Sequence, residues 1–238
     1  MLFQAVVFDL FGTLVPAFPS SLFEQSLGQM ADAVGVSHMH FSRMWIEETW
    51  EARAMGGFAS TEDTARYICN AVGVTPTKSQ LAEAALIRVE FTRKILQPRP
   101  DAISTLKHVK SADLGLALIS DCTPEVPQLW PETPFASLID VPIFSCAVGM
   151  KKPDPRIYRL ACDGLGVAPH QCLYVGDGFS RELTGAANVG MHTVLIASPG
   201  EVPADAPGYE GDTWPGPRVE RLSEVMTLLR LGFDVSPS

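Results

Sequence analysis

The sequence predicts an α/β protein: a Rossmann-like, doubly wound parallel sheet with an inserted all-helical cap subdomain. Short, wholly apolar segments alternate with helical segments over most of the chain, which is typical of a parallel sheet covered on both faces. One long stretch, 16–98, interrupts this alternation and shows helical periodicity alone. We therefore expect a Rossmann-like core formed by residues 1–15 and 99–238, and a helical cap formed by residues 16–98.

The core strands are expected where continuous apolar runs end at turn residues. The first run, 4–10, contains Ala-Val-Val-Phe and stops before Gly12. Further strands are predicted at 114–119, 143–146, 172–175 and 192–196. Helices are predicted at 101–110, 154–165 and 180–189, the first two starting at an aspartate beside a proline.

The stretch 16–98 is predicted to be helical throughout. Apolar residues recur there at helical spacing, as in Phe41, Met44 and Trp45. No convincing strand pattern interrupts them. We interpret Trp45 and Trp50 as helix-packing core residues.

Composition and charge narrow the range of partners. The 238 residues include 18 Lys+Arg and 27 Asp+Glu, a formal net charge of −9, which argues against binding to nucleic acid or to an anionic membrane. No apolar run approaches the roughly 18 residues that cross a bilayer, and the N-terminal segment lacks the features of a signal peptide. The five scattered cysteines are typical of free thiols in a reducing compartment. We expect a cytoplasmic protein with a small-molecule substrate; oligomeric state is not readable.

Polar residues stand directly after several of the predicted strands. Asp9 follows the first strand, and Ser120 and Asp121 follow the second. Lys152 precedes Pro-Asp-Pro, and Asp177 follows Gly176. Because ligands bind at the carboxyl edge of an open parallel sheet, these side chains are expected to converge there.

In this order, with a helical insert after the first, the segments resemble the motifs of the haloacid dehalogenase superfamily of aspartate-nucleophile hydrolases over nearly the full chain. The resemblance implies a mobile helical cap over a Rossmann-like core. It implies that Asp9 is the nucleophile, that Ser120 binds the transferred group, and that Lys152, rather than Lys151, is the catalytic lysine. Asp177 matches the acid that holds Mg²⁺ in the phosphatase branches.

Phosphoryl transfer to a carboxylate needs local positive charge, because two like charges 4 Å apart repel by roughly 4 kcal/mol at an effective dielectric of 20. Mg²⁺ prefers oxygen ligands, which Asp9, Asp177 and the backbone carbonyl of Phe11 can supply. Lys152 would neutralise Asp9 and the phosphoryl oxygens. The predicted substrate-binding residues are Phe11, Gly12, Thr13, Asp121 and Lys152, and Glu182 is predicted to orient Lys152 or Asp177 from behind.

Three residues depart from the phosphatase pattern. Most phosphatases of the superfamily carry a second aspartate, a general acid, two residues after the nucleophile, where this chain has Phe11; such help is worth about 10² to 10⁴ in rate. An aromatic residue there, and Tyr158, resemble the metal-free dehalogenase branch, whose halide leaves without a proton. Asp121 replaces the usual asparagine, and a cap arginine (Arg43, Arg53 or Arg66) would have to offset it for a carboxylate substrate. We expect these three arginines to be solvated.

The retained Asp177 favours a Mg²⁺-dependent phosphatase that acts on a small phosphorylated metabolite through an aspartyl phosphate on Asp9. Because Phe11 removes the acid, we expect either a preference for good leaving groups, such as aryl or acyl phosphates, or an acid supplied by the cap or by the substrate. The alternatives are a metal-free 2-haloacid dehalogenase and a non-catalytic protein that kept the fold. A phosphonoacetaldehyde hydrolase, which also lacks the second aspartate, is disfavoured because the cap has no lysine before Lys78.

Overall fold

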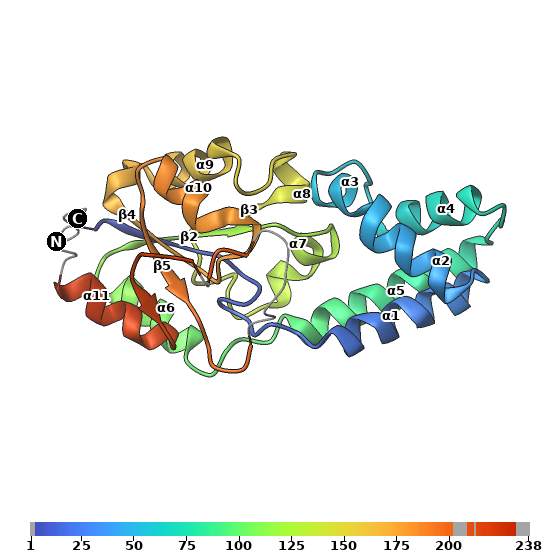
Figure 1. Cartoon of the computed structure of the whole chain (residues 1–238), viewed down its shortest axis with the longest axis horizontal. Coiled ribbons are helices and arrows are strands. Elements are labelled where there is room, and N and C mark those ends of the chain that lie inside the picture. Colours follow the sequence, from blue (N-terminus) through green and yellow to red (C-terminus); the bar gives the residue numbers. More distant parts are fainter. Residues whose placement is uncertain (1–2, 202–208, 212, 232–238) are drawn as a thin grey trace.

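The computed structural model describes residues 3–201, 209–211 and 213–231 of the chain. At its centre lies a parallel sheet with the strand order β3-β2-β1-β4-β5-β6 (Figure 1). The strands are β1 (Ala5–Phe8), β2 (Gly115–Ser120), β3 (Val141–Phe144), β4 (Cys172–Gly176), β5 (His192–Ile196) and β6 (Arg218–Val219). The chain steps outward from β1 to β3 and then returns to the other side of β1. This confirms the predicted doubly wound α/β class.

The register of the central strands sets where the site lies. Phe8 of β1 pairs with Leu118 of β2 on one side and with Val175 of β4 on the other. The backbone N–H of Asp9 continues the ladder by donating to the Val175 carbonyl at 2.9 Å. The residues that follow β1 and β4 therefore leave the sheet side by side, at the switch point where ligands bind in this topology.

Helices cover both faces of the sheet. Helices α6 (Ala102–Ser111), α7 (Glu125–Leu129) and α11 (Val225–Leu231) pack on the face of Val6 and Phe8. Helices α9 (Pro155–Leu165) and α10 (Glu182–Asn188) pack on the face of Ala5 and Val7, while the short α8 (Ser145–Val148) follows β3. Because both faces are buried, β1 has to be apolar at every position, and all four of its residues are buried.

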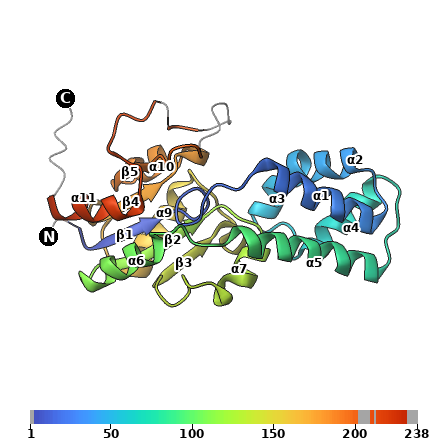
Figure 2. The ribbon, with the colours of Figure 1, turned by 90° about the horizontal axis from the view of Figure 1, so that it is seen from below.

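Five helices lie between β1 and α6 and form a body to one side of the sheet (Figures 1 and 2). They are α1 (Ser20–Val34), α2 (His38–Arg43), α3 (Trp50–Ala54), α4 (Thr61–Ala71) and α5 (Lys78–Ile95), with a π-helical turn at Met44–Glu48. Their inward faces form a hydrophobic cluster of their own around Phe41 and Trp45. We call this body the cap; the domain limits at 15/16 and 98/99 stay predictions.

Side-chain caps explain where several of these helices begin. Ser37, Ser60 and Thr77 each accept a backbone N–H from three residues onward, which satisfies a donor that the first helical turn leaves unpaired. Thr77 and Gln80 complete a reciprocal capping box at the start of α5. The starts of these three cap helices are therefore determined by neighbouring residues of the sequence, without a contact with the core.

Some predicted boundaries were wrong. The strand expected at 143–146 is Val141–Phe144, and a helical turn follows at Ser145. The helix expected from Ser180 begins at Glu182, because Ser180 and Arg181 hold left-handed φ values of 57° and 53°. Trp50, interpreted as a core residue, is 38% exposed, whereas Trp45 is fully buried as expected.

Short elements escaped the sequence interpretation. Strand β6 has only two residues, and α7 and α11 span five and seven, too few for a periodic pattern to stand out. The five cysteines form no disulfide, as expected. Among the described residues, no helix is both long and apolar enough to cross a membrane.

Candidate active site

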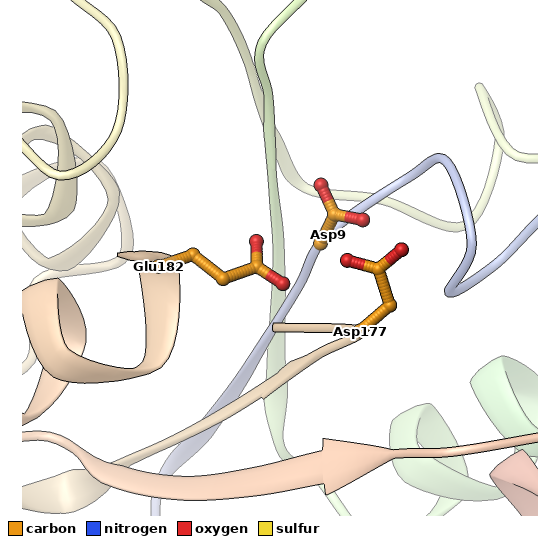
Figure 3. Close-up of side chains that lie close together, drawn as sticks. All are labelled: Asp9, Asp177 and Glu182. Atoms are coloured by element: carbon orange, nitrogen blue, oxygen red, sulfur yellow. The ribbon is translucent and has the colours of Figure 1, made fainter. Parts of the chain in front are cut away.

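The aspartates that follow β1 and β4 meet at the edge of the sheet, together with a glutamate from the start of α10. Carboxylate oxygens of Asp9, Asp177 and Glu182 all lie within 4.8 Å of one another. Figure 3 shows the three side chains pointing toward one another from separate segments. The convergence of Asp9 and Asp177 is what their strand-end positions predict.

Lys152 places its ammonium between two of these carboxylates. Its Nζ donates to Asp9 Oδ1 and to Glu182 Oε2, each at 2.5 Å, and its side chain is almost completely buried. The Lys152 backbone N–H donates to Asp121 Oδ1 at 3.0 Å, which fixes the loop that carries the lysine. Lys151 points elsewhere and pairs with Glu51 of the cap at 2.9 Å.

Glu182 is fully buried and both of its carboxylate oxygens are used. Besides Lys152, Oε2 accepts from the Tyr174 hydroxyl at 2.7 Å, and Oε1 accepts from the Gly178 backbone N–H at 2.9 Å. A Cβ on Gly176 would overlap this carboxylate, so the glycine is required for Glu182 to reach under β4. Glu182 therefore holds Lys152 and the loop after β4.

Tyr158 has a supporting place in the same region. Its hydroxyl donates to the Glu182 backbone carbonyl at 3.0 Å, and its ring is fully buried between α9 and the sheet. The sequence interpretation took Tyr158 as a dehalogenase-like feature. In the structure it positions the first residue of α10.

The loop after β1 is held by two contacts. Gly12 adopts a φ of +78°, and a Cβ there would overlap the Asp177 carboxylate, so only glycine lets the two strand ends approach this closely. Arg99 donates to the carbonyls of Gly12 and Thr13 at 2.6 and 2.7 Å and pairs with Glu201 at 2.5 Å. The sequence interpretation missed Arg99, whose only signal is its place between two prolines where the cap ends.

Buried negative charge in this cluster exceeds buried positive charge. Three carboxylates face one ammonium, and Asp9 Oδ2 is buried without a hydrogen-bond partner among the described residues. Burial and the nearby Glu182 raise the pKa of Asp9 to about 7, against the opposing effect of Lys152. Burial, Glu182 and Asp9 raise the pKa of Asp177 well above its usual value.

The same carboxylates are suitable ligands for a divalent cation. Mg²⁺ prefers oxygen ligands, and Asp9 Oδ2, which has no hydrogen-bond partner in the described residues, has a lone pair available beside Asp177. Glu182 is already engaged through both oxygens. Asp9 and Asp177 are therefore the side chains that would hold the ion, with Glu182 behind Lys152.

The remaining predicted site residues surround this cluster. Ser120 ends β2, is fully buried, and its hydroxyl has no oxygen or nitrogen partner within the described chain. Phe11 and Asp121 line a cavity of about 430 Å³ between the core and the cap. Thr13, predicted to bind substrate, is fully buried and does not line this cavity.

The cap arginines only partly follow expectation. Arg43 and Arg66 are exposed, as predicted, but the prediction for Arg53 was wrong: it is 2% exposed and lines the cavity. Arg88 of α5 lines it as well and was missed. Its signal was a buried stripe at helical spacing, in which Leu81, Ala84, Arg88 and Phe91 share one face of α5.

Comparison with known proteins places the chain in a family. Residues 3–190 match the family model of the haloacid dehalogenase-like hydrolases. The chain belongs to this family of hydrolases. It is 31% identical over 212 residues to (S)-2-haloacid dehalogenase 4A of Burkholderia cepacia, covering 84% of this chain and 85% of that protein.

A phosphatase and a further dehalogenase are similar to the chain as well. Phosphoserine phosphatase of Thermus thermophilus is 28% identical over 170 residues, covering 70% of this chain and 66% of that enzyme. L-2-haloacid dehalogenase of Xanthobacter autotrophicus, solved with chloropropionic acid covalently bound, shares the fold at a TM-score of 0.62 and 24% identity, covering 97% of this chain and all of that one. Family membership thus makes the chain a hydrolase and leaves its reaction to the site residues.

Proposed function

We propose that this hydrolase is a Mg²⁺-dependent phosphatase with Asp9 as its nucleophile. The observation that carries the proposal is the excess of carboxylate: Asp9, Asp177 and Glu182 converge, one ammonium, that of Lys152, pairs with Asp9 and Glu182, and Asp9 Oδ2 has no partner within the described residues. A buried anion without compensation is costly, and a divalent cation offsets two negative charges at once. When bound, Mg²⁺ would act as a Lewis acid toward a phosphoryl oxygen.

The protein's own groups account for the remaining steps. The Asp9 carboxylate attacks phosphorus, the bond from phosphorus to the leaving oxygen breaks, and an aspartyl phosphate results. Lys152 neutralises Asp9 through Oδ1, and the Ser120 hydroxyl at the end of the neighbouring strand donates to the phosphoryl group. Water then attacks the aspartyl phosphate, which releases inorganic phosphate and restores Asp9.

Phe11 determines which leaving groups are accepted. It stands two residues after the nucleophile, lines the cavity, and packs edge-to-face on Phe18 with ring centroids 6.1 Å apart. Its side chain cannot donate a proton to a departing alkoxide. We therefore expect aryl and acyl phosphates, whose leaving groups need no proton, to be preferred over alkyl phosphates.

The direct test is hydrolysis of p-nitrophenyl phosphate with millimolar Mg²⁺ and, in parallel, with EDTA. The proposal predicts release of p-nitrophenol that requires Mg²⁺ and is lost in EDTA. Turnover that is indifferent to EDTA would contradict it, as would no turnover of either p-nitrophenyl or acetyl phosphate.

A second candidate, a 2-haloacid dehalogenase, is supported by the apolar cavity beside Phe11 and by the dehalogenases among the relatives. In that reaction the Asp9 carboxylate attacks the halogen-bearing carbon, halide leaves with its electron pair, and water hydrolyses the resulting ester. Chloride release from (S)-2-chloropropionate in EDTA would establish it. The two assays together distinguish the candidates. A dehalogenase releases chloride with EDTA and with Mg²⁺ alike, whereas the phosphatase releases no chloride and hydrolyses p-nitrophenyl phosphate only with Mg²⁺.

A further inference from the structure

The cavity lined by Phe11 combines apolar side chains with two arginines. Phe18, Phe23, Ile46 and Trp50 of the cap contribute apolar surface to its roughly 430 Å³. Arg53 and Arg88, also from the cap, line the same space. An apolar cavity with a few polar groups at one place is the usual form of a small-molecule site.

Arg88 is buried without the hydrogen bonds that a guanidinium normally makes. The residue is 7% exposed, and its Nε and Nη1 atoms have no hydrogen-bond partner in the described part of the chain. Its nearest carboxylate is Glu125, at 3.8 Å from Nε. Aromatic rings enclose the group instead, with the ring centroids of Phe91 and Phe23 5.0 and 5.4 Å from its central carbon.

The neighbouring Arg53 is held in place by the cap itself. Its Nη2 donates to the Trp45 carbonyl at 2.5 Å, its Nε donates to the Thr49 hydroxyl, and its guanidinium lies over the Trp45 ring at 4.2 Å. Burial and the nearby Arg88 lower the pKa of Arg53 to about 9. Two guanidinium groups therefore share one buried carboxylate, Glu125, which leaves one positive charge uncompensated.

We infer that the cap cavity binds the carboxylate of a small molecule with an apolar body, and that Arg88 is the residue that recognises it. A carboxylate matches the fork of a guanidinium and supplies acceptors for its unpartnered N–H groups. A monoanion would neutralise the one uncompensated positive charge. A phosphate dianion would leave one negative charge unpaired, and its dehydration among the aromatic side chains would cost more free energy. The body of the ligand would fill the space along Ile46 and Trp50.

This site also restricts the substrate. Phe11, two residues after Asp9, and Asp121, directly after Ser120, line the same cavity from the core. This step rests on the phosphatase proposal. The substrate is then a phosphorylated carboxylic acid with an apolar body, which places its phosphoryl group at Asp9 and its carboxylate at Arg88. The carboxylate site itself does not depend on the reaction.

Binding of phenylacetate, measured by isothermal titration calorimetry in EDTA, tests the inference without metal or turnover. Phenylacetamide, which has the same shape and no charge, is the matched probe. We expect phenylacetate to bind at least about tenfold more tightly than the amide, because hydrogen bonds between two charged groups are stronger than those to a neutral amide. Equal affinities for the two probes, or no binding of phenylacetate at tens of millimolar, would overturn the inference.

Three variants locate the effect. Arg88→Gln should abolish the preference for the acid, and the exposed control Arg43→Gln should leave it unchanged. Ile46→Glu, at a side chain that is 46% exposed and tolerant of charge, should reverse the preference by repelling the acid, and keeps the test decisive should Arg88→Gln unfold. A preference that survives both cavity substitutions would also overturn the inference. Because p-nitrophenyl phosphate carries no carboxylate, its hydrolysis tests the phosphatase proposal separately.

Discussion

At the sheet edge three carboxylates converge and one ammonium pairs with two of them, while in the cap two guanidinium groups share one carboxylate. One group lies at the end of the core sheet and the other in the cap, and the cavity between core and cap is lined by Phe11 and Asp121 from the core end and by Arg53 and Arg88 from the cap end. Buried charge is costly unless it is paired. The two excesses have opposite sign, so each end calls for a different ligand: a cation in the core and an anion in the cap.

The two regions are also built differently. In the core, the charged groups come from four separate segments, and glycines at 12 and 176 allow their close approach. In the cap, Arg88 comes from the face of α5 that also carries the hydrophobic cluster, and Arg53 from the short helix α3, where it lies over the Trp45 ring of that cluster. Glu125, from the core helix α7, reaches across to Arg88 and accepts hydrogen bonds from Thr61 of the cap and from Thr123. Charge at the sheet edge is thus set by strand order, and charge in the cap by helix packing.

The largest effect is expected from Asp9→Asn. Removal of the nucleophile should lower kcat/KM for p-nitrophenyl phosphate by at least about 10⁴-fold. Because the change also removes one of the excess negative charges, the melting temperature should be equal to or above that of the wild type. Retained activity would mean that another group is the nucleophile. A biological effect that survives the substitution would favour the non-catalytic alternative.

A comparison of Asp177→Asn with Glu182→Gln tests which of the two carboxylates binds the ion directly. We expect the Mg²⁺ concentration for half-maximal activity to rise by at least about 100-fold, because an amide replaces a charged ligand. Glu182→Gln should raise it by about 10- to 100-fold, the range for residues that support a metal ligand. The order of the two effects is decisive: a larger shift for Glu182→Gln would reverse the assigned roles.

Stability of the cap–core contact should depend on Glu125. Burial alone would raise the pKa of Glu125, but Arg88 and the hydroxyls of Thr123 and Thr61 outweigh it and lower the pKa. Glu125→Gln should therefore reduce the free energy of unfolding by about 3 kcal/mol at neutral pH, because Arg88 loses the carboxylate that faces it. Glu132→Gln, which breaks the exposed pair with Arg93, is the control and should cost less than about 1 kcal/mol.

The same variant has a defined pH dependence. Since the folded state lowers the pKa of Glu125, its stabilisation is complete above the usual glutamate value of 4.5 and declines as pH falls toward the folded value. Urea titrations of wild type and Glu125→Gln should converge in acid. A difference that grows as the pH falls would contradict this account of the pair.

Phe11→Asp should produce the smallest change, in selectivity rather than in overall rate. An added carboxylic acid near the leaving oxygen would favour substrates whose leaving group needs a proton. We expect the ratio of kcat/KM for an alkyl phosphate to that for p-nitrophenyl phosphate to rise by about tenfold or more. Phe11→Leu is the control for lost aromatic packing and should leave the ratio unchanged. A ratio unaffected by Phe11→Asp would show that the missing acid does not limit the reaction.

The sequence predicted one of the two regions far better than the other. Asp9 and Asp177 could be placed together because they end adjacent parallel strands, where the topology alone determines proximity. The role of Arg88 could not be predicted, because it depends on which residues α5 contacts within the cap. An arginine in an apolar stripe can be either exposed at its edge or buried, and the sequence does not distinguish the two. The position of Glu182 beside the site could be predicted, but the direction of its side chain could not, because two left-handed residues, Ser180 and Arg181, precede it.

Calorimetric titration of the metal-free protein with Mg²⁺ most directly tests the claim that the acidic cluster holds a cation. The account predicts one binding event in the wild type, at micromolar to millimolar Mg²⁺, which is lost in both Asp9→Asn and Asp177→Asn. Absence of binding to the folded wild type at millimolar Mg²⁺, or binding that persists unchanged in both variants, would contradict it.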